Sequence, residues 1–118
     1  MKWYLAKLIY RIICGDGDHK PQFDEQLRLI CAEDDLDAFQ KARLTGQTEE
    51  DTFLNNTQKL VHWKFIDVPE LHPLSELTDG AEIYSRIYEE EDADDYIKII
   101  QRRAAYLMEN TFSNVAFN

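Results

Sequence analysis

An acidic passage occurs twice in this chain at a fixed separation, and each copy stands where a strand-like run gives way to a helix-like one. The first copy, EDDLDAFQKA, covers residues 33–42, and the second, EEDADDYIKI, covers residues 90–99. A shift of 57 positions aligns further segments in the same order of strand, strand and helix, without an insertion. The shared order predicts a tandem ββα-ββα repeat, with pseudo-repeats over residues 3–56 and 60–110 and a tail over residues 111–118.

Two stretches near the N-terminus alternate between apolar and polar residues, which is typical of strands with one face inward. In residues 4–14 every even position is apolar, whereas the odd positions include Lys7 and Arg11. In the next stretch they take odd positions, namely Phe23, Leu27, Leu29 and Cys31. The segment between them, GDGDHKPQ, has the Gly, Asp and Pro content of a turn. We therefore expect a hairpin that places Ala6 near Cys31, with the odd positions of the second strand facing the core.

Both acidic passages have the composition of a helix start, because carboxylates accept hydrogen bonds from first-turn N–H groups and complement the positive end of the helix dipole. The first passage predicts a helix that begins near Asp34 and stops at Gly46. The second precedes apolar residues at helical spacing over residues 93–108, the clearest secondary-structure signal in the chain. Thr48 and the acidic residues after it predict a further short helix that reaches Leu54.

Two more strands are predicted in the second half of the chain. Residues 60–68 alternate, with Val61, Trp63 and Phe65 on the inward side. Residues 82–88 form the fourth predicted strand, and its inward face is ambiguous because isoleucines and tyrosines compete for the core. These elements predict an α+β fold, in which one four-stranded antiparallel sheet carries both main helices on one face.

The length and composition of the chain predict one domain over residues 1–118, because 118 residues with 44% apolar side chains can build one core. The sheet face away from the helices would carry Trp3 among charged residues such as Lys7 and Arg11. A half-polar face that contains a tryptophan is either exposed to solvent or an interface. The second alternative predicts a homodimer.

The net charge of -10 excludes some partners and favours others. Nucleic acid is not expected, because its affinity for proteins depends on cations that displace counterions. The same charge would attract a basic protein partner. Lys7 and Arg11 interrupt the apolar run that a secretory signal needs, and no run approaches the ~18 apolar residues of a membrane span. With only two cysteines, the chain is expected to be cytoplasmic, without a disulfide and without a membrane contact.

No motif of a known catalytic class occurs in the sequence, so no catalytic residue, cofactor or metal site is predicted. The three histidines are scattered, without a second zinc ligand at a suitable spacing. The candidate binding residues are Glu49, Glu50, His62 and Trp63, which would place acid and base groups beside an aromatic wall.

Several motifs in combination resemble an uncharacterised bacterial family. They are KWYLAK, IICGDG, FDEQLRLI, GQ-x-EE-x-x-F, W-x-F and DGAE followed by SRI. The combination is similar to the domain of unknown function 4288, over nearly the whole chain. The resemblance implies no activity, ligand or functional residue, but it directs attention to Glu49, Glu50 and Trp63.

Three functional readings remain open at this stage. The first is a non-enzymatic acidic binding or regulatory module that acts through protein–protein contact. The second is a small-molecule binder or an enzyme that uses the Glu49/Glu50/Trp63 region, with an unknown small molecule. The third is a structural subunit of a homo-oligomer.

Overall fold

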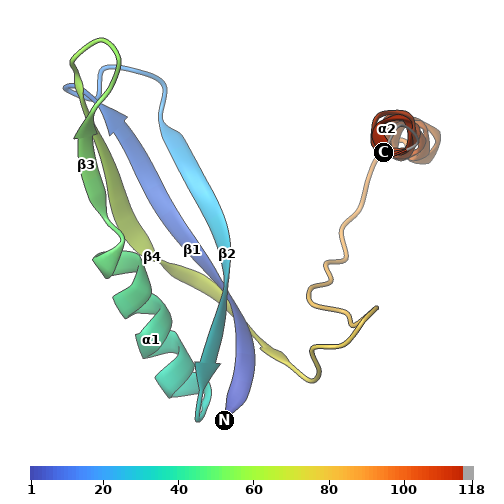
Figure 1. The fold of residues 1–118 in the computed structure, drawn as a ribbon, viewed down its shortest axis with the longest axis horizontal. Helices are drawn as coiled ribbons and strands as arrows, with labels where there is room; N and C mark the ends of the chain where they lie inside the picture. Colours follow the sequence, from blue (N-terminus) through green and yellow to red (C-terminus); the bar gives the residue numbers. More distant parts are fainter. Residues whose placement is uncertain (116–118) are drawn as a thin grey trace. The chain divides into compact units, whose positions relative to one another are not determined.

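The fold was analysed in a computed structural model, which describes the backbone of residues 1–115 and the side chains of residues 1–110. The chain forms two compact units, Met1–Ser85 and a C-terminal unit that begins at Arg86. The first unit contains four strands and one helix (Figure 1). Their bounds are β1 Lys2–Cys14, β2 Gln22–Ala32, α1 Asp35–Thr48, β3 Asp51–Leu54 and β4 Leu60–Leu74.

The four strands form one antiparallel sheet in the order β2-β1-β4-β3, and α1 lies along one of its faces (Figure 1). The α+β class and the four-stranded antiparallel sheet are therefore confirmed. We call the face that packs on α1 the helix face and the opposite face the outer face. The sheet is curled, and the pairing of β1 with β4 shifts register between Lys7 and Tyr10.

The core lies between the helix face and α1. The even residues of β1 supply most of it, as the alternation predicted: Tyr4, Ala6, Leu8 and Tyr10 are at most 1% exposed. On α1 the facing residues are Ala38 and Ala42, both fully buried. Small side chains at these positions let the helix approach the sheet closely, so that large side chains of β1 fill the space without voids.

Both acidic passages begin helices, as predicted. Asp34 caps α1, because its carboxylate accepts a hydrogen bond from the Asp37 N–H at 2.8 Å. Asp92 does the same before α2 (Ala93–Val115), where it accepts from the Asp95 N–H at 3.0 Å. The passage therefore occurs twice because each helix needs a carboxylate at its start.

The tandem ββα-ββα repeat is not confirmed. The predicted strand over residues 82–88 is not a strand, and the fourth strand of the sheet is instead β3, where a short helix was expected. The helix expected on the sheet from residue 93 onward belongs to the second unit. Of the predicted tail, residues 111–115 continue α2 and residues 116–118 lie outside the described part of the chain.

The register of the hairpin is also different from the prediction. Trp3, and not Ala6, lies opposite Cys31, while Ala6 lies opposite Arg28. Because directly opposite residues share a face, the even residues of β2 lie on the helix face and its odd residues on the outer face. The predicted inward face of β2 was therefore wrong, and its large apolar residues are on the outer face.

Gly46 does not end α1, which continues to Thr48. It is buried against β4, where a Cβ atom would lie within 2.6 Å of three ring carbons of Phe65. The glycine is therefore required by the closeness of the helix to the sheet, and not by a turn.

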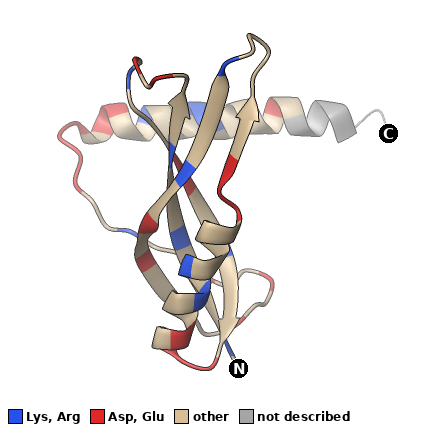
Figure 2. Ribbon diagram, turned by 90° about the vertical axis from the view of Figure 1, so that its left-hand side faces the viewer, with Lys and Arg blue, Asp and Glu red and all other residues tan. Residues whose placement is uncertain are grey.

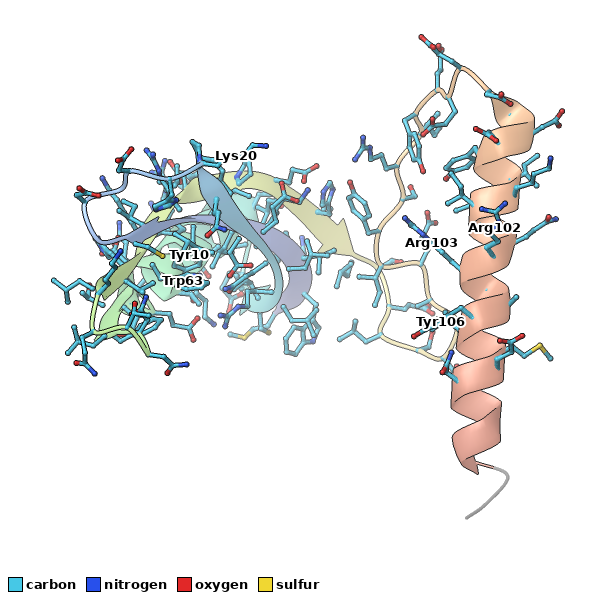
Figure 3. The ribbon with its side chains drawn as sticks, turned by 90° about the horizontal axis from the view of Figure 1, so that it is seen from above. Tyr10, Lys20, Trp63, Arg102, Arg103 and Tyr106 are labelled. Atoms are coloured by element: carbon cyan, nitrogen blue, oxygen red, sulfur yellow. The ribbon has the colours of Figure 1, made fainter. Side chains whose placement is uncertain are left out.

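The second unit is described by itself. The hydroxyl groups of Tyr88 and Tyr96 are hydrogen-bonded to each other, and Tyr96 lies on α2. The two rings pack edge to face, with their centres 6.0 Å apart. Arg102 and Arg103 lie on α2 (Figure 3). Ile97, Ile100 and Leu107 of this helix are at least 44% exposed.

Candidate functional site

Three of the four predicted binding residues meet on the helix face beyond the C-terminal end of α1. Glu49 and Glu50 follow α1, and Trp63 comes from β4. Trp63 stacks on Phe53 of β3 at 6.1 Å. Figure 3 shows Trp63 and Tyr10 on the sheet of the first unit. The expectation was that Glu49, Glu50 and His62 approach one another beside Trp63, and the binding role of these four residues stays a prediction.

Side chains of β2 connect Glu49 and Trp63 into one polar network, formed by Asp24, Gln26, Arg28, Glu49 and Trp63, and Glu50 binds the backbone of β4 beside it. The Trp63 indole N–H donates to Asp24 Oδ2 at 3.0 Å, and Gln26 donates to the same oxygen at 2.7 Å. Arg28 donates to Gln26 and forms an ion pair with Glu49. Glu50 accepts from the backbone N–H of Phe65 at 2.7 Å. The polar network therefore ties β2, the end of α1 and β4 together.

His62 is not part of this network. It precedes Trp63 in β4, and successive residues of a strand point to opposite faces. His62 lies opposite Ile13 of β1, on the outer face, whereas Trp63 lies opposite Ile12 on the helix face. The fourth predicted residue is consequently separated from the other three by the thickness of the sheet.

The cavities of the first unit are formed by other residues. One of about 830 Å3 lies at the end of the sheet, between the β1–β2 and β3–β4 loops, and Lys20 and Lys59 are among its lining residues. His19 supports this loop, because its Nε2 accepts from the Cys14 N–H at 3.0 Å. Another cavity, of about 310 Å3, lies near His72. Glu49, Glu50 and Trp63 line neither cavity.

Tyr10 lies beneath the polar network and is 1% exposed. Its hydroxyl donates to the carbonyl of Gly46 at 2.9 Å, which joins β1 to the last turn of α1. Burial, followed by the negative charge of Glu49, raises the pKa of Tyr10 above its ordinary value. Both causes favour the neutral phenol, so the folded chain holds this proton more tightly than the unfolded chain does.

A pH dependence of stability follows from Tyr10. A raised pKa contributes stability that is fully present below the unfolded pKa, about 10, and is lost as the pH rises through the folded value. We expect the free energy of unfolding to fall above about pH 10, and Tyr10→Phe to remove part of this fall. Urea denaturation at a series of alkaline pH values measures it. If the free energy of unfolding falls equally with rising alkaline pH in wild type and in Tyr10→Phe, the Tyr10 hydroxyl is not responsible for the fall.

Sequence reasoning missed the apolar residues on the outer face of β2. Phe23, Leu27 and Leu29 are 57%, 54% and 53% exposed, although all three were expected in the core. The alternation alone shows that the two faces of β2 differ, but not which of them meets the helix. The polar residues Asp24, Gln26 and Arg28 could have indicated the answer, because they satisfy one another within the polar network.

Part of the outer face is covered by residues that follow β4. The ring of Tyr84 contacts the ring of His72 at 5.3 Å, and Lys7 Nζ lies 6.0 Å from the centre of the Tyr84 ring. Leu5, also on the outer face, is only 5% exposed. The exposed apolar side chains of the outer face thus lie on β2, with Leu54 and Leu60 at the β3–β4 end of the sheet and Trp3 on β1.

Acidic side chains gather at the start of α1 and before α2, while Lys and Arg residues are spread over the strands and both helices (Figure 2). In α1 two of these carboxylates serve their own helix, since Asp34 caps it and Asp37 accepts from the Glu33 N–H. The basic protein partner expected from the net charge stays a prediction.

Neither a metal-ligating cluster nor a membrane-spanning helix occurs among the described residues. These residues contain no group of three His, Cys, Asp or Glu side chains arranged to hold a metal ion. Within the same part of the chain, no helix combines the length and the apolar character that crossing a membrane requires.

Comparison with known proteins gives one result. The family model Domain of unknown function (DUF4288) matches residues 3–85. No curated protein and no solved structure matches the chain. The match ends where the first compact unit ends, at Ser85, so it is shorter than the nearly complete coverage suggested by the motifs. Because it spans more than two-thirds of the chain, this protein belongs to the family Domain of unknown function (DUF4288).

Proposed function

We propose that this protein is a non-enzymatic protein-binding module that acts as a homodimer, with strand β2 as the interface. The binding surface is the β2 border, which we define as the unpaired edge of β2 together with Phe23, Leu27 and Leu29. The observation that carries the proposal is that an edge strand of this length presents three large apolar side chains, each more than half exposed.

The edge of β2 has the properties of a strand that accepts another strand. It is 11 residues long, contains no proline or glycine, and pairs with β1 without a register shift. A long, regular and apolar edge is a template for pairing, because its outward N–H and C=O groups have no partner in the sheet. Native proteins seldom leave such an edge open to water.

The opposite border of the sheet is protected, which makes β2 the distinctive one. β3 has only four residues. Beyond it, the Glu50 carboxylate accepts from the Phe65 N–H, so a side chain occupies the edge of β4. Pro69 and Pro73, also in β4, have no N–H to offer. Short strands, prolines and covering side chains are devices that prevent edge pairing; β2 has none of these three, although it carries the charged residues Asp24, Glu25 and Arg28.

A second copy of the chain is the partner that this border fits best. Two copies of one edge strand pair antiparallel about a two-fold axis, which is the commonest symmetry of soluble oligomers. The added strand would lie about 4.8 Å from β2 and cover the exposed flank of its side chains. Main-chain hydrogen bonds then supply affinity, and the alternate side chains supply specificity.

The oligomeric state of charged variants tests this proposal. Leu27→Lys and Leu29→Lys each place a charge on the border, twice per dimer, and both residues are already exposed, so the fold itself should persist. We expect Leu29→Lys to weaken dimerisation by roughly 100-fold and Leu27→Lys to weaken it less, because Glu25 lies two residues from Leu27 on the same face and can pair with the new charge; both are measured by size-exclusion chromatography with light scattering at several concentrations.

Leu44→Lys is the matched control, because Leu44 is 63% exposed but lies on α1. It should dimerise as wild type does. A wild-type chain that is monomeric at every concentration would contradict the proposal, and so would β2 variants that dimerise like the control.

The small-molecule or enzymatic alternative has less support from the geometry. The carboxylates of Glu49 and Glu50 and the Trp63 indole N–H all have partners inside the protein. A binding site needs polar groups that converge on a cavity, and here the same groups converge on one another. We therefore assign the polar network a structural role: it holds β2 against β4 and against the end of α1.

A further inference from the structure

We infer that the two β2 strands pair in one specific register, with the two-fold axis at Gln26. This inference rests on the proposed homodimer and specifies how the two copies recognise each other. It goes further because the register decides which side chains meet, and because it gives the polar network of the helix face a second role at the interface.

Symmetry limits the possible registers. The two-fold axis of an antiparallel edge pair is perpendicular to the sheet, so residues on the helix face of one copy meet residues on the helix face of the other. One residue of β2 must therefore lie directly opposite its own copy, and the axis passes between these two residues. Near the middle of the strand the candidates are Gln26, on the helix face, and Leu27, on the outer face.

An axis at Gln26 pairs opposite charges on the helix face and large apolar side chains on part of the outer face. On the outer face Phe23 meets Leu29 of the second copy, which pairs an aromatic with a large aliphatic side chain, and symmetry repeats the contact. On the helix face Asp24 meets Arg28 of the second copy, which pairs opposite charges twice. Aromatic–aliphatic and opposite-charge pairs are the cross-strand contacts that stabilise sheets.

An axis at Leu27 is less favourable. Asp24 would then meet Ile30, which is 4% exposed and part of the core. On the outer face Glu25 would meet Leu29, just as it meets Leu27 when the axis lies at Gln26, so the helix face decides between the two registers. A carboxylate opposite an apolar residue loses water without gaining a partner, which costs free energy.

Asp24 and Arg28 of β2 each have one polar atom that makes no contact within the polar network. Asp24 uses Oδ2 for both of its hydrogen bonds, and Arg28 uses Nε and Nη2 for its contacts with Gln26 and Glu49. Among the described residues, Asp24 Oδ1 and Arg28 Nη1 have no hydrogen-bond partner. A carboxylate oxygen and a guanidinium nitrogen therefore remain to bind their counterparts across the edge.

Disulfide cross-linking of the full chain measures the register. In a background with Cys14→Ser and Cys31→Ser, Gln26→Cys places two thiols directly opposite each other, within the reach of a disulfide. Leu27→Cys places its thiols on a diagonal, with Cα atoms roughly 7–8 Å apart, too far for an unstrained disulfide. We expect Gln26→Cys to cross-link roughly 100-fold faster, because opposed thiols have a millimolar effective concentration.

A second pair of variants covers the case in which Gln26→Cys disturbs the polar network. Phe23→Cys and Leu29→Cys, each in the same background, should cross-link when mixed and exchanged, but neither should cross-link alone. Non-reducing gel electrophoresis gives both results.

The outcomes separate the inference from the proposed function. A dimer that cross-links through Leu27→Cys, or through Phe23→Cys alone, would overturn the register and leave the homodimer intact. A background chain that stays monomeric in solution would overturn both. Cross-linking through Gln26→Cys and through the mixed pair would support both.

Discussion

Leu8→Ala should lower the free energy of unfolding by about 2–5 kcal/mol, the range for removing a buried leucine side chain. Leu8 is fully buried between the sheet and α1, among Tyr4, Tyr10 and Ala42. The substitution removes apolar contacts and leaves a cavity that these neighbours fill only in part. Urea denaturation at one fixed protein concentration, followed by circular dichroism, measures the loss.

Leu36→Ala is the control for this prediction. Leu36 lies on α1 but is 65% exposed, so its truncation should change the free energy of unfolding by no more than about 0.5 kcal/mol. Equal effects of the two substitutions would show that the core does not lie between the helix face and α1.

Gly46→Val should lower the free energy of unfolding by about 3 kcal/mol, the upper range for overpacking. A Cβ atom at this position would overlap the ring of Phe65. That ring contacts Tyr10 edge to face at 5.6 Å, so it has little room to move. Tyr10 also binds the Gly46 carbonyl, and a displaced helix would weaken that hydrogen bond.

The order of variants makes the Gly46 prediction specific. Intrinsic helix propensity alone predicts that Gly46→Ala stabilises α1 by up to about 1 kcal/mol. The packing predicts the reverse, with wild type most stable, Gly46→Ala intermediate and Gly46→Val least stable. Gln47→Val, at the exposed neighbouring position, controls for propensity and should change little. A more stable Gly46→Ala chain would mean that helix and sheet are less closely packed.

The elements that the sequence predicts best are those whose residue pattern depends on contact with a single neighbouring element. The even residues of β1 and the inward residues Val61, Trp63 and Phe65 of β4 follow from alternation, since both strands have a helix face and an outer face. The two helix starts follow from local capping by Asp34 and Asp92. None of these inferences requires the topology of the sheet.

The elements that depend on register and topology were predicted wrongly. The hairpin pairs β1 with β2 in a different register from the predicted one, so that Cys31 lies opposite Trp3 and not opposite Ala6. The tandem repeat rested on two similar acidic passages, but their similarity reflects capping chemistry and not a shared ββα architecture. In physical terms, two helices with the same start need not belong to equivalent folding units.

The candidate site shows the same division. The polar network contains Glu49 and Trp63, and Glu50 binds the Phe65 N–H beside it. His62 lies on the opposite face of the sheet, because successive residues of β4 alternate between the two faces. The β2 border was missed because its apolar residues were assigned to the core. Exposed apolar residues on an edge strand have the same sequence pattern as buried ones, so only the register distinguishes them.

Sedimentation velocity of the unmodified full chain over a range of concentrations tests the central claim most directly. The proposed pairing of β2 predicts a species of twice the chain mass of 13.9 kDa, which dissociates on dilution. A single species of 13.9 kDa at every concentration would contradict it.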